Sequence, residues 1–301
     1  MKICWVGLGH MGLPMVVHLH RAGFDVSAFD VSAEARAAAA AVGLRAPDTL
    51  LEAAEGAEVI FTMLPTGDHV RKVLLESGLD QATAGAMCVD SSTISPAQAR
   101  EISAEVAGTG RSFVDAPVSG GTAGAEDGTL TFMVGGTAEQ FAHVTPLLEA
   151  MGRRHFHVGG TGCGQAAKLV NNMMLAMNMA SVSEAAVIAD RLGLDARTFW
   201  EIAQVSSGDS WVLRNFYPIP GVVPTSPASH DFAPGFTALL MRKDVGLALD
   251  ETSAHAVPGA MTHQAARLLD QLIQAGEGHL DFSAVVRVAA GELPADTSLA
   301  G

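Results

Sequence analysis

Cysteine is scarce in this sequence. The 301 residues include three cysteines, Cys4, Cys88 and Cys163, which are widely separated and odd in number. Because most of them also stand in apolar, strand-like runs, we expect buried free thiols in a reducing compartment and no disulfide framework. No metal is expected either, since the scattered histidines lack cysteine or carboxylate partners at ligand spacing.

Long apolar runs and basic residues are scarce as well. No apolar run approaches the roughly 18 residues needed to cross a bilayer, and the first, residues 3–6, leads directly into glycines. We therefore expect a cytoplasmic protein. The 18 Lys+Arg against 32 Asp+Glu give a net charge of -14, which excludes nucleic acid and anionic membranes as partners. An anionic substrate would need a local reversal of this charge.

The length and the 49% hydrophobic content predict two domains. Up to about residue 160, β-rich runs alternate with alanine-rich helical segments, which is typical of an α/β, doubly wound parallel sheet. We assign residues 1–162 to this domain. The candidate strands are residues 3–6, 26–29, 59–63, 87–90, 113–115 and 130–134.

The remaining residues, 163–301, predict an all-helical domain for substrate binding and oligomerisation. Residues 165–192 contain neither proline nor glycine and would form an interdomain helix roughly 40 Å long. This helix is apolar nearly all round, so we expect it to be buried. The proline-rich residues 217–234 are typical of a functional loop.

The first predicted strand leads into a glycine-rich turn. A predicted helix follows the turn, and Asp30 ends the second strand 18 residues after the last glycine. Between a strand and a helix, such glycines allow a pyrophosphate to approach the helix N-terminus, and the carboxylate accepts the ribose hydroxyls. The pattern predicts a Rossmann-type dinucleotide site at Gly7, Leu8, Gly9, His10, Met11, Gly12 and Asp30.

Asp30 also bears on the choice of cofactor. A carboxylate there would repel the 2'-phosphate of NADP, so NAD is favoured. Arg36 follows Glu34 on the next predicted helix, and we interpret Arg36 as half of a solvated ion pair.

Two further strand ends carry candidate cofactor contacts. Leu64 and Pro65 follow one strand, and Ser92 and Thr93 follow the next. In doubly wound sheets, ligands gather at the carboxyl ends of the strands. Ser92 and Thr93 could equally cap the helix that begins near Pro96.

Residues 115–122 combine a hydroxyl, that of Ser119, with backbone N–H groups at Gly120 and Gly121. Such a turn suits a carboxylate ligand, although an ordinary glycine turn explains it equally well. It is not a nucleophile elbow of the GxSxG type, which disfavours acyl transfer.

Lys168 lies near the start of the long predicted helix, with Asn172 four residues on and therefore on the same face. A lysine in the first turn is unfavourable against the helix dipole, and a snorkelling lysine is the simple alternative. If this face lines the interdomain cleft, burial and the helix N-terminus would depress the pKa of Lys168, as a general base needs. Lys243 belongs to a later charged cluster, residues 241–244, that a solvated helix face would also explain.

Four of these segments together resemble the signature segments of the β-hydroxyacid dehydrogenases. They are residues 7–15, 115–121, 164–172 and 243–244, which span most of the chain in the family's order. Within the family, residues 206–211, 217–222 and 240–248 look most like the 3-hydroxyisobutyrate dehydrogenases.

The resemblance implies NAD-dependent oxidation of 3-hydroxyisobutyrate to methylmalonate semialdehyde, a step of valine breakdown, in a homodimer or homotetramer. It makes Lys168 the catalytic base, and it assigns Leu64, Pro65, Thr93 and Lys243 to the cofactor. His18 and His69 stand where family members often have asparagine. The substrate would contact Ser119, Gly120, Gly121 and Asn172, with Trp211 and Phe236 bounding the loop that selects its variable group.

Other functions stay open at this point. Serine shares the C3 alcohol and the carboxylate, so an L-serine or broad 3-hydroxyacid dehydrogenase is the first alternative; the apolar loop favours the methyl group of 3-hydroxyisobutyrate. A semialdehyde reductase that uses NADPH fits Asp30 poorly. A non-catalytic NAD-binding protein would not need Lys168, Asn172 and the Ser119 turn together.

Overall fold

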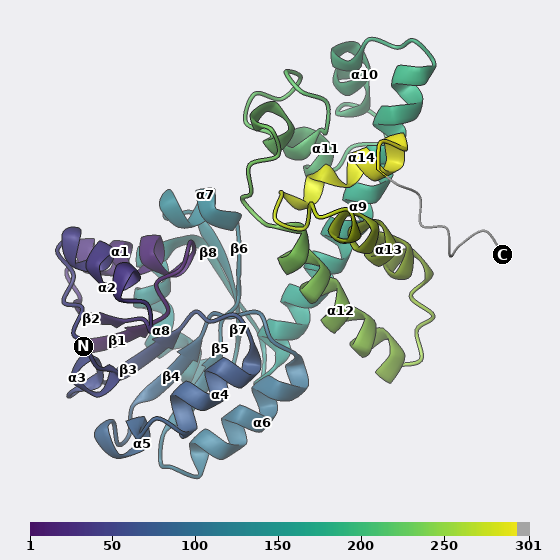
Figure 1. Ribbon diagram of the computed structural model, residues 1–301. Helices are drawn as coiled ribbons and strands as arrows, with labels where there is room; N and C mark the ends of the chain where they lie inside the picture. Colours follow the sequence, from purple (N-terminus) through teal and green to yellow (C-terminus); the bar gives the residue numbers. More distant parts are fainter. Residues whose placement is uncertain (294–301) are drawn as a thin grey trace. The chain divides into compact units, whose positions relative to one another are not determined.

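The structure is a computed structural model that describes residues 1–293 (Figure 1). Its contacts divide the chain into two compact units, Met1–Lys168 and Leu169–Gly301. The division lies inside one long helix, α9 (Cys163–Arg191), whereas the sequence pattern suggested a boundary between residues 162 and 163. Among the described residues, none of the helices is long and apolar enough to cross a membrane.

Unit 1 is built on an eight-stranded sheet with the order β2-β1-β3-β4-β5-β7-β6, and β8 pairs with β7. The five strands from β2 to β5 are parallel, β7 runs antiparallel to β5 and β6, and β8 runs parallel to β7. The predicted Rossmann-type fold is therefore confirmed. The strands are β1 (Lys2–Val6), β2 (Asp25–Phe29), β3 (Val59–Thr62), β4 (Met87–Asp90), β5 (Ser112–Asp115), β6 (Val118–Ser119), β7 (Leu130–Gly135) and β8 (Gly152–Gly159).

Two of these strands were not predicted. β6 has only two residues, and β8 is largely exposed, with Arg153 and Arg154 in its sequence. Neither strand therefore shows the apolar run that marks a buried strand of a parallel sheet.

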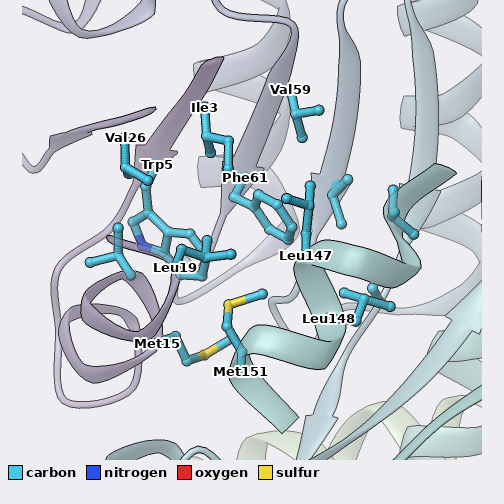
Figure 2. Packing of buried hydrophobic residues seen from close by; sticks show 14 of the residues in the cluster. Ile3, Trp5, Met15, Leu19, Val26, Val59, Phe61, Leu147, Leu148 and Met151 are labelled. Atoms are coloured by element: carbon cyan, nitrogen blue, oxygen red, sulfur yellow. The ribbon is translucent and has the colours of Figure 1, made fainter. Parts of the chain in front are cut away.

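Helices cover both faces of the sheet. Successive residues of a strand point to opposite faces, so neighbours in one strand pack against different helices. Trp5 packs with α1 and α8, as Figure 2 shows, whereas its neighbours Cys4 and Val6 pack with α3 to α6. Each face therefore has its own apolar core. The helices of unit 1 are α1 (Gly12–Arg21), α2 (Ala33–Ala41), α3 (Leu50–Ala54), α4 (Gly67–Leu75), α5 (Leu79–Ala82), α6 (Pro96–Ala107), α7 (Gly121–Glu126) and α8 (Ala138–Met151).

Unit 2 is helical, as predicted, and packs around its own apolar core, which includes Met179, Met241 and Phe282. The proline-rich residues 217–234 form a loop that contains one short 3-10 helix. The elements after α9 are α10 (Ala196–Ala203), α11 (Trp211–Phe216), η1 (Pro227–His230), α12 (Ala238–Ala254), α13 (Ala260–Gln274), η2 (Phe282–Ala284) and α14 (Val285–Ala290).

The expectation that α9 is buried all round is wrong on one face. Leu169 and Met179 are buried, but Val170 and Met174 are each 54% exposed in the single chain. Although α9 is apolar nearly all round, one of its faces is exposed in the single chain.

Candidate functional site

The glycine-rich turn joins β1 to α1, and two of its three glycines are required by packing. A Cβ on Gly7, which has a φ of 103°, would clash with the carbonyl oxygen of Met63, and a Cβ on Gly12 would clash with that of Gly7. Gly9 differs, because a Cβ there would meet no atom within 4 Å. Its backbone is exposed at a pocket of about 530 Å³ that is also lined by His10. An open glycine at a helix N-terminus is what a pyrophosphate needs for close approach.

Asp30 lies beside this turn. Its Oδ2 accepts a hydrogen bond from the backbone N–H of Leu8 at 2.8 Å, and its Oδ1 accepts one from Ser32 at 2.8 Å. Each carboxylate oxygen keeps a second lone pair, so the group can still accept ribose hydroxyls.

Arg36 forms an ion pair as predicted, but its partner is the exposed Asp48 and not Glu34. The Arg36 guanidinium donates to the carbonyl of Asp30 at 2.9 Å, pairs with Asp48 at 3.3 Å and lies over the Phe29 ring. Its side chain is only 16% exposed. The backbone carbonyls and the ring at the end of β2 hold this arginine more closely than a helix neighbour could.

Polar side chains meet where β3, β4 and β5 end. Thr62 pairs in register with Asp90, and Asp90 with Asp115, so the three residues lie side by side across the sheet. Asp90 is fully buried, and Oδ1 accepts hydrogen bonds from the Thr62 hydroxyl at 2.8 Å and the Ser92 N–H at 3.1 Å. Burial raises the pKa of Asp90 to about 6, although the hydrogen bonds from Ser92 and Thr62 oppose the shift.

Ser92 joins two of the loops that were expected to contact the cofactor. Its hydroxyl accepts a hydrogen bond from the backbone N–H of Leu64 at 2.8 Å. The alternative role as a helix cap is wrong for Ser92 and Thr93, because Ser95 caps α6 through a reciprocal pair with Gln98. The loops after β3 and β4 are thus tied together at the edge where a dinucleotide binds in such sheets.

Gln165, in the first turn of α9, contacts the same loop. Its side chain is fully buried, Nε2 donates to the Ser92 carbonyl at 2.7 Å, and Oε1 accepts from the Ile94 N–H at 3.1 Å. The two backbone groups flank Thr93 on either side. The loop that carries Thr93 is therefore attached to the helix that carries Lys168.

Asp115 caps the same end of α9. Its carboxylate accepts from the N–H of Gly162 at 2.7 Å and from that of Gln165 at 2.9 Å. A negative charge at this end of a helix stabilises the helix dipole. Burial raises the pKa of Asp115, while these backbone hydrogen bonds oppose the shift. Lys168, one turn further along, is buried at 9% exposure.

The Ser119 turn links β6 to α7. Gly120 and Gly121 have φ values of 138° and 63°, which few other residues adopt. A Cβ on Gly121 would meet no atom within 4 Å, so its backbone faces open space, and Ser119 is partly exposed. The turn can thus offer a hydroxyl and backbone N–H groups to a ligand.

In unit 2, Asn172 and Lys243 meet at one buried carboxylate, that of Asp244. Asn172 Nδ2 donates to Asp244 Oδ2 at 2.6 Å, and Lys243 Nζ lies 3.2 Å from Oδ1. Asp244 and Asn172 are 2% and 1% exposed. The interpretation of residues 241–244 as a solvated charged face is therefore wrong, since both Met241 and the carboxylate of Asp244 are buried.

Trp211 and Phe236 belong to an aromatic cluster of unit 2. Trp211 contacts Phe216 with ring centroids 5.1 Å apart, and Phe282 bridges Phe216 to Phe236 at 5.4 and 6.0 Å. Trp211 is 53% exposed. The cluster offers apolar surface rather than charge.

Four polar residues of these networks had no individual role in the sequence analysis: Asp90, Asp115, Gln165 and Asp244. One signal could have indicated two of them, because Asp90 and Asp115 each stand last in a predicted strand. Gln165 and Asp244 lie inside two of the segments that resemble the family signatures, but no pattern in the residues around them indicated their contacts. In the described part of the chain, no group of three His, Cys, Asp or Glu side chains could hold a metal ion.

Comparisons with known proteins match both halves of the chain. Residues 2–160 match a family described as the NAD-binding domain of 6-phosphogluconate dehydrogenase. Residues 162–289 match a family described as NAD-binding of NADP-dependent 3-hydroxyisobutyrate dehydrogenase.

Relatives that match nearly the whole chain have more than one name. An NAD-dependent L-serine dehydrogenase of Pseudomonas aeruginosa is 42% identical over 95% of this chain and 97% of its own. A 3-hydroxyisobutyrate dehydrogenase of the same organism is 42% identical over 96% and 99%. A solved structure of Mycobacterium tuberculosis 3-hydroxyisobutyrate dehydrogenase with L-serine superposes with a TM-score of 0.89, at 41% identity over 95% and 98%.

Proposed function

Because the chain belongs to the β-hydroxyacid dehydrogenase family and is an NAD-dependent 3-hydroxyacid dehydrogenase, we propose that its preferred substrate is 3-hydroxyisobutyrate. The product would be methylmalonate semialdehyde, and the step would belong to valine breakdown. The fit of unit 1 to the cofactor supports the activity, since Gly9 leaves open space at the N-terminus of α1 and Asp30 lies beside it.

The placement of Lys168 carries this proposal. Lys168 is a buried lysine on a helix whose first turn is attached to the loop of Thr93. A neutral Lys168 would take the proton of the substrate hydroxyl while the C3 hydrogen leaves as hydride and the C–O bond becomes a carbonyl. Bound NAD supplies the hydride acceptor.

The other residues would hold the substrate. The Ser119 hydroxyl and the N–H groups of Gly120 and Gly121 would bind the carboxylate. Asn172 would bind near the reacting hydroxyl, and Leu64, Pro65, Thr93 and Lys243 would contact the cofactor. Lys243 and the backbone N–H groups of the Ser119 turn would supply the positive potential that an anionic substrate needs in a chain of net charge -14, and Lys168 would add to it only once it has taken the proton.

L-serine is the second candidate, and the relative named for it is as similar as the one named for 3-hydroxyisobutyrate. L-serine has an ammonium group where 3-hydroxyisobutyrate has a methyl group. The apolar cluster of Trp211 and Phe236 favours the methyl group, because a buried ammonium is costly unless a carboxylate pairs with it.

NADH absorbance tests both candidates. The purified chain is given NAD with 3-hydroxyisobutyrate, L-serine or 3-hydroxypropionate, and kcat/KM is measured for each. We expect 3-hydroxyisobutyrate to exceed L-serine by about tenfold or more, a difference of about 1.4 kcal/mol. A higher kcat/KM for L-serine would assign the chain to serine oxidation, and no reduction of NAD with any of the three would contradict the proposal.

We also propose that the chain forms a homodimer or homotetramer. The exposed apolar residues of α9, Val170 and Met174 among them, support self-association. Light scattering after size-exclusion chromatography gives the mass directly. A mass of 31.1 kDa at micromolar concentration would mean a monomer and contradict this proposal.

A further inference from the structure

We propose that Gln165 is a positioning residue, which holds the loop of Thr93 at a fixed place relative to the proposed base Lys168. This inference rests on the proposed dehydrogenase function. It concerns a side chain that is fully buried and that the mechanism above does not use.

The two ends of the Gln165 amide bind two different backbone groups. Oε1 accepts from the Ile94 N–H at 3.1 Å, and Nε2 donates to the Ser92 carbonyl at 2.7 Å. Only one orientation of the amide satisfies both, because an N–H must meet an oxygen acceptor and a carbonyl must meet a donor. Gln165 thus forms hydrogen bonds with the backbone immediately before and immediately after Thr93.

The backbone of Gln165 is itself held in place. Its N–H donates to Asp115 Oδ2 at 2.9 Å, and Asp115 is the last residue of β5. Asp115 Oδ1 also accepts from Gly162, just before α9. The start of α9 is therefore fixed to the sheet, and the Gln165 side chain extends from a fixed point to the neighbouring strand's loop.

This arrangement sets a distance that hydride transfer depends on. Lys168 lies three residues after Gln165 on α9, where side chains are neighbours, about 5–6 Å apart at Cβ. Thr93 lies between the Ser92 carbonyl and the Ile94 N–H, and it is proposed to contact the cofactor. A shift of about 1 Å between a base and a reacting centre can cost about 100-fold in rate. Gln165 would therefore affect kcat more than cofactor binding.

Two substitutions separate the hydrogen bonds from mere packing. Gln165→Met keeps the length and removes both hydrogen bonds. Gln165→Glu keeps the shape, but as a carboxylate it cannot donate to Ser92, whereas its protonated form can donate to Ser92 and accept from Ile94. Burial and the carboxylates of Asp115 and Asp90 favour protonation of the introduced carboxyl group, whereas the N-terminus of α9 favours its ionised form, so the protonated fraction should rise as the pH falls. Gln98→Met is the matched control, because Gln98 binds the backbone of Ser95 in the same region.

The measurement is kcat relative to wild type from pH 5.5 to 8.5, with the Kd for NADH measured for each variant. We expect Gln165→Met to lower kcat about tenfold or more at every pH. Gln165→Glu should show a similar loss at pH 8.5 and approach wild type as the pH falls, while Gln98→Met and every NADH Kd stay within about threefold of wild type. A Gln165→Met kcat near that of wild type, a flat pH ratio for Gln165→Glu, or loss of NADH binding in parallel with kcat would overturn the proposal.

Hydrogen exchange keeps this test separate from the proposed function. The Ile94 amide should exchange faster in Gln165→Met than in wild type, and in Gln165→Glu it should stay protected. If the wild-type chain oxidises none of the acids, the dehydrogenase proposal fails. Independently of that result, unchanged exchange of the Ile94 amide in Gln165→Met would overturn the proposal that Gln165 holds the loop of Thr93.

Discussion

Asn172 donates through Nδ2 to Oδ2 of Asp244 at 2.6 Å, and both side chains are almost completely buried. Removal of either partner leaves the other as a buried polar group without this hydrogen bond, so the two single losses should not add. In a double-mutant cycle of Asn172→Ala and Asp244→Ala, we expect a coupling of about 1–3 kcal/mol in the free energy of unfolding. Urea denaturation measures it. Pairing Asn172→Ala with Asp209→Ala, at an exposed carboxylate, is the control and should give additive losses.

Lys168→Ala should abolish most of the turnover. Loss of a general base lowers kcat by about 100-fold to 10,000-fold, while the Kd for NADH should change little. Steady-state kinetics and NADH fluorescence titration measure the two effects. Lys72→Ala, at an exposed lysine of α4, is the control. A Lys168→Ala enzyme with more than about a tenth of wild-type kcat would not be consistent with a base at this position.

Asp30→Ala should weaken the preference for NAD over NADP. The substitution removes the charge that repels a 2'-phosphate, and the Arg36 guanidinium remains at the end of β2. We expect the ratio of kcat/KM for NAD to that for NADP to fall by about tenfold or more. Asp25→Ala, at the exposed start of the same strand, should leave the ratio unchanged. An unchanged ratio in Asp30→Ala would remove Asp30 from the ribose site.

Gly9→Ala should weaken cofactor binding without unfolding the protein. The added Cβ meets no protein atom within 4 Å, so only a ligand at the turn would meet the new methyl group. We expect the Kd for NADH to rise about tenfold or more with an unchanged melting temperature. Gly208→Ala is the control, since its Cβ also enters open space. An unaltered NADH Kd in Gly9→Ala would mean that the pyrophosphate lies elsewhere.

Asp90→Asn should change how stability depends on pH. The pKa of Asp90 is raised from 3.8 to about 6 in the folded state, so between these values the native chain binds more protons than the unfolded chain. This group's contribution to stability therefore falls as the pH rises through that window and is constant above it. Relative to wild type, Asp90→Asn should gain about 2 kcal/mol between pH 4 and pH 7. Urea midpoints at both values measure the gain, and an equal difference at both would contradict the shift.

Strand and helix patterns in the sequence were enough to predict the sheet and the helical unit. Strands such as β4 are buried on both faces and appear as apolar runs, and α9 after its second residue is a long segment without proline or glycine. β8 was missed because exposed residues dominate it, and β6 was missed because it has only two residues.

The polar networks could not be predicted in the same way. Gln165 and Ser92 are 73 residues apart in sequence, and Asn172 and Asp244 are 72 apart. Hydrogen bonds across such separations depend on tertiary packing and leave no periodic pattern. Ser95 rather than Ser92 caps α6 because Ser95 directly precedes Pro96, the first residue of the helix, and the Ser92 hydroxyl binds the backbone of Leu64 instead.

Thr62, Asp90 and Asp115 are paired in register across three strands, and this register limits where residues can be inserted in the chain. One residue inserted within β4 would turn every later side chain of that strand to the opposite face, which would move Asp90 away from Thr62 and expose apolar positions. The same insertion after α6, at Thr109, would lengthen only a surface connection. We therefore expect natural length variation in this protein's lineage to accumulate in the loops that lead into the strands and to avoid the strands themselves.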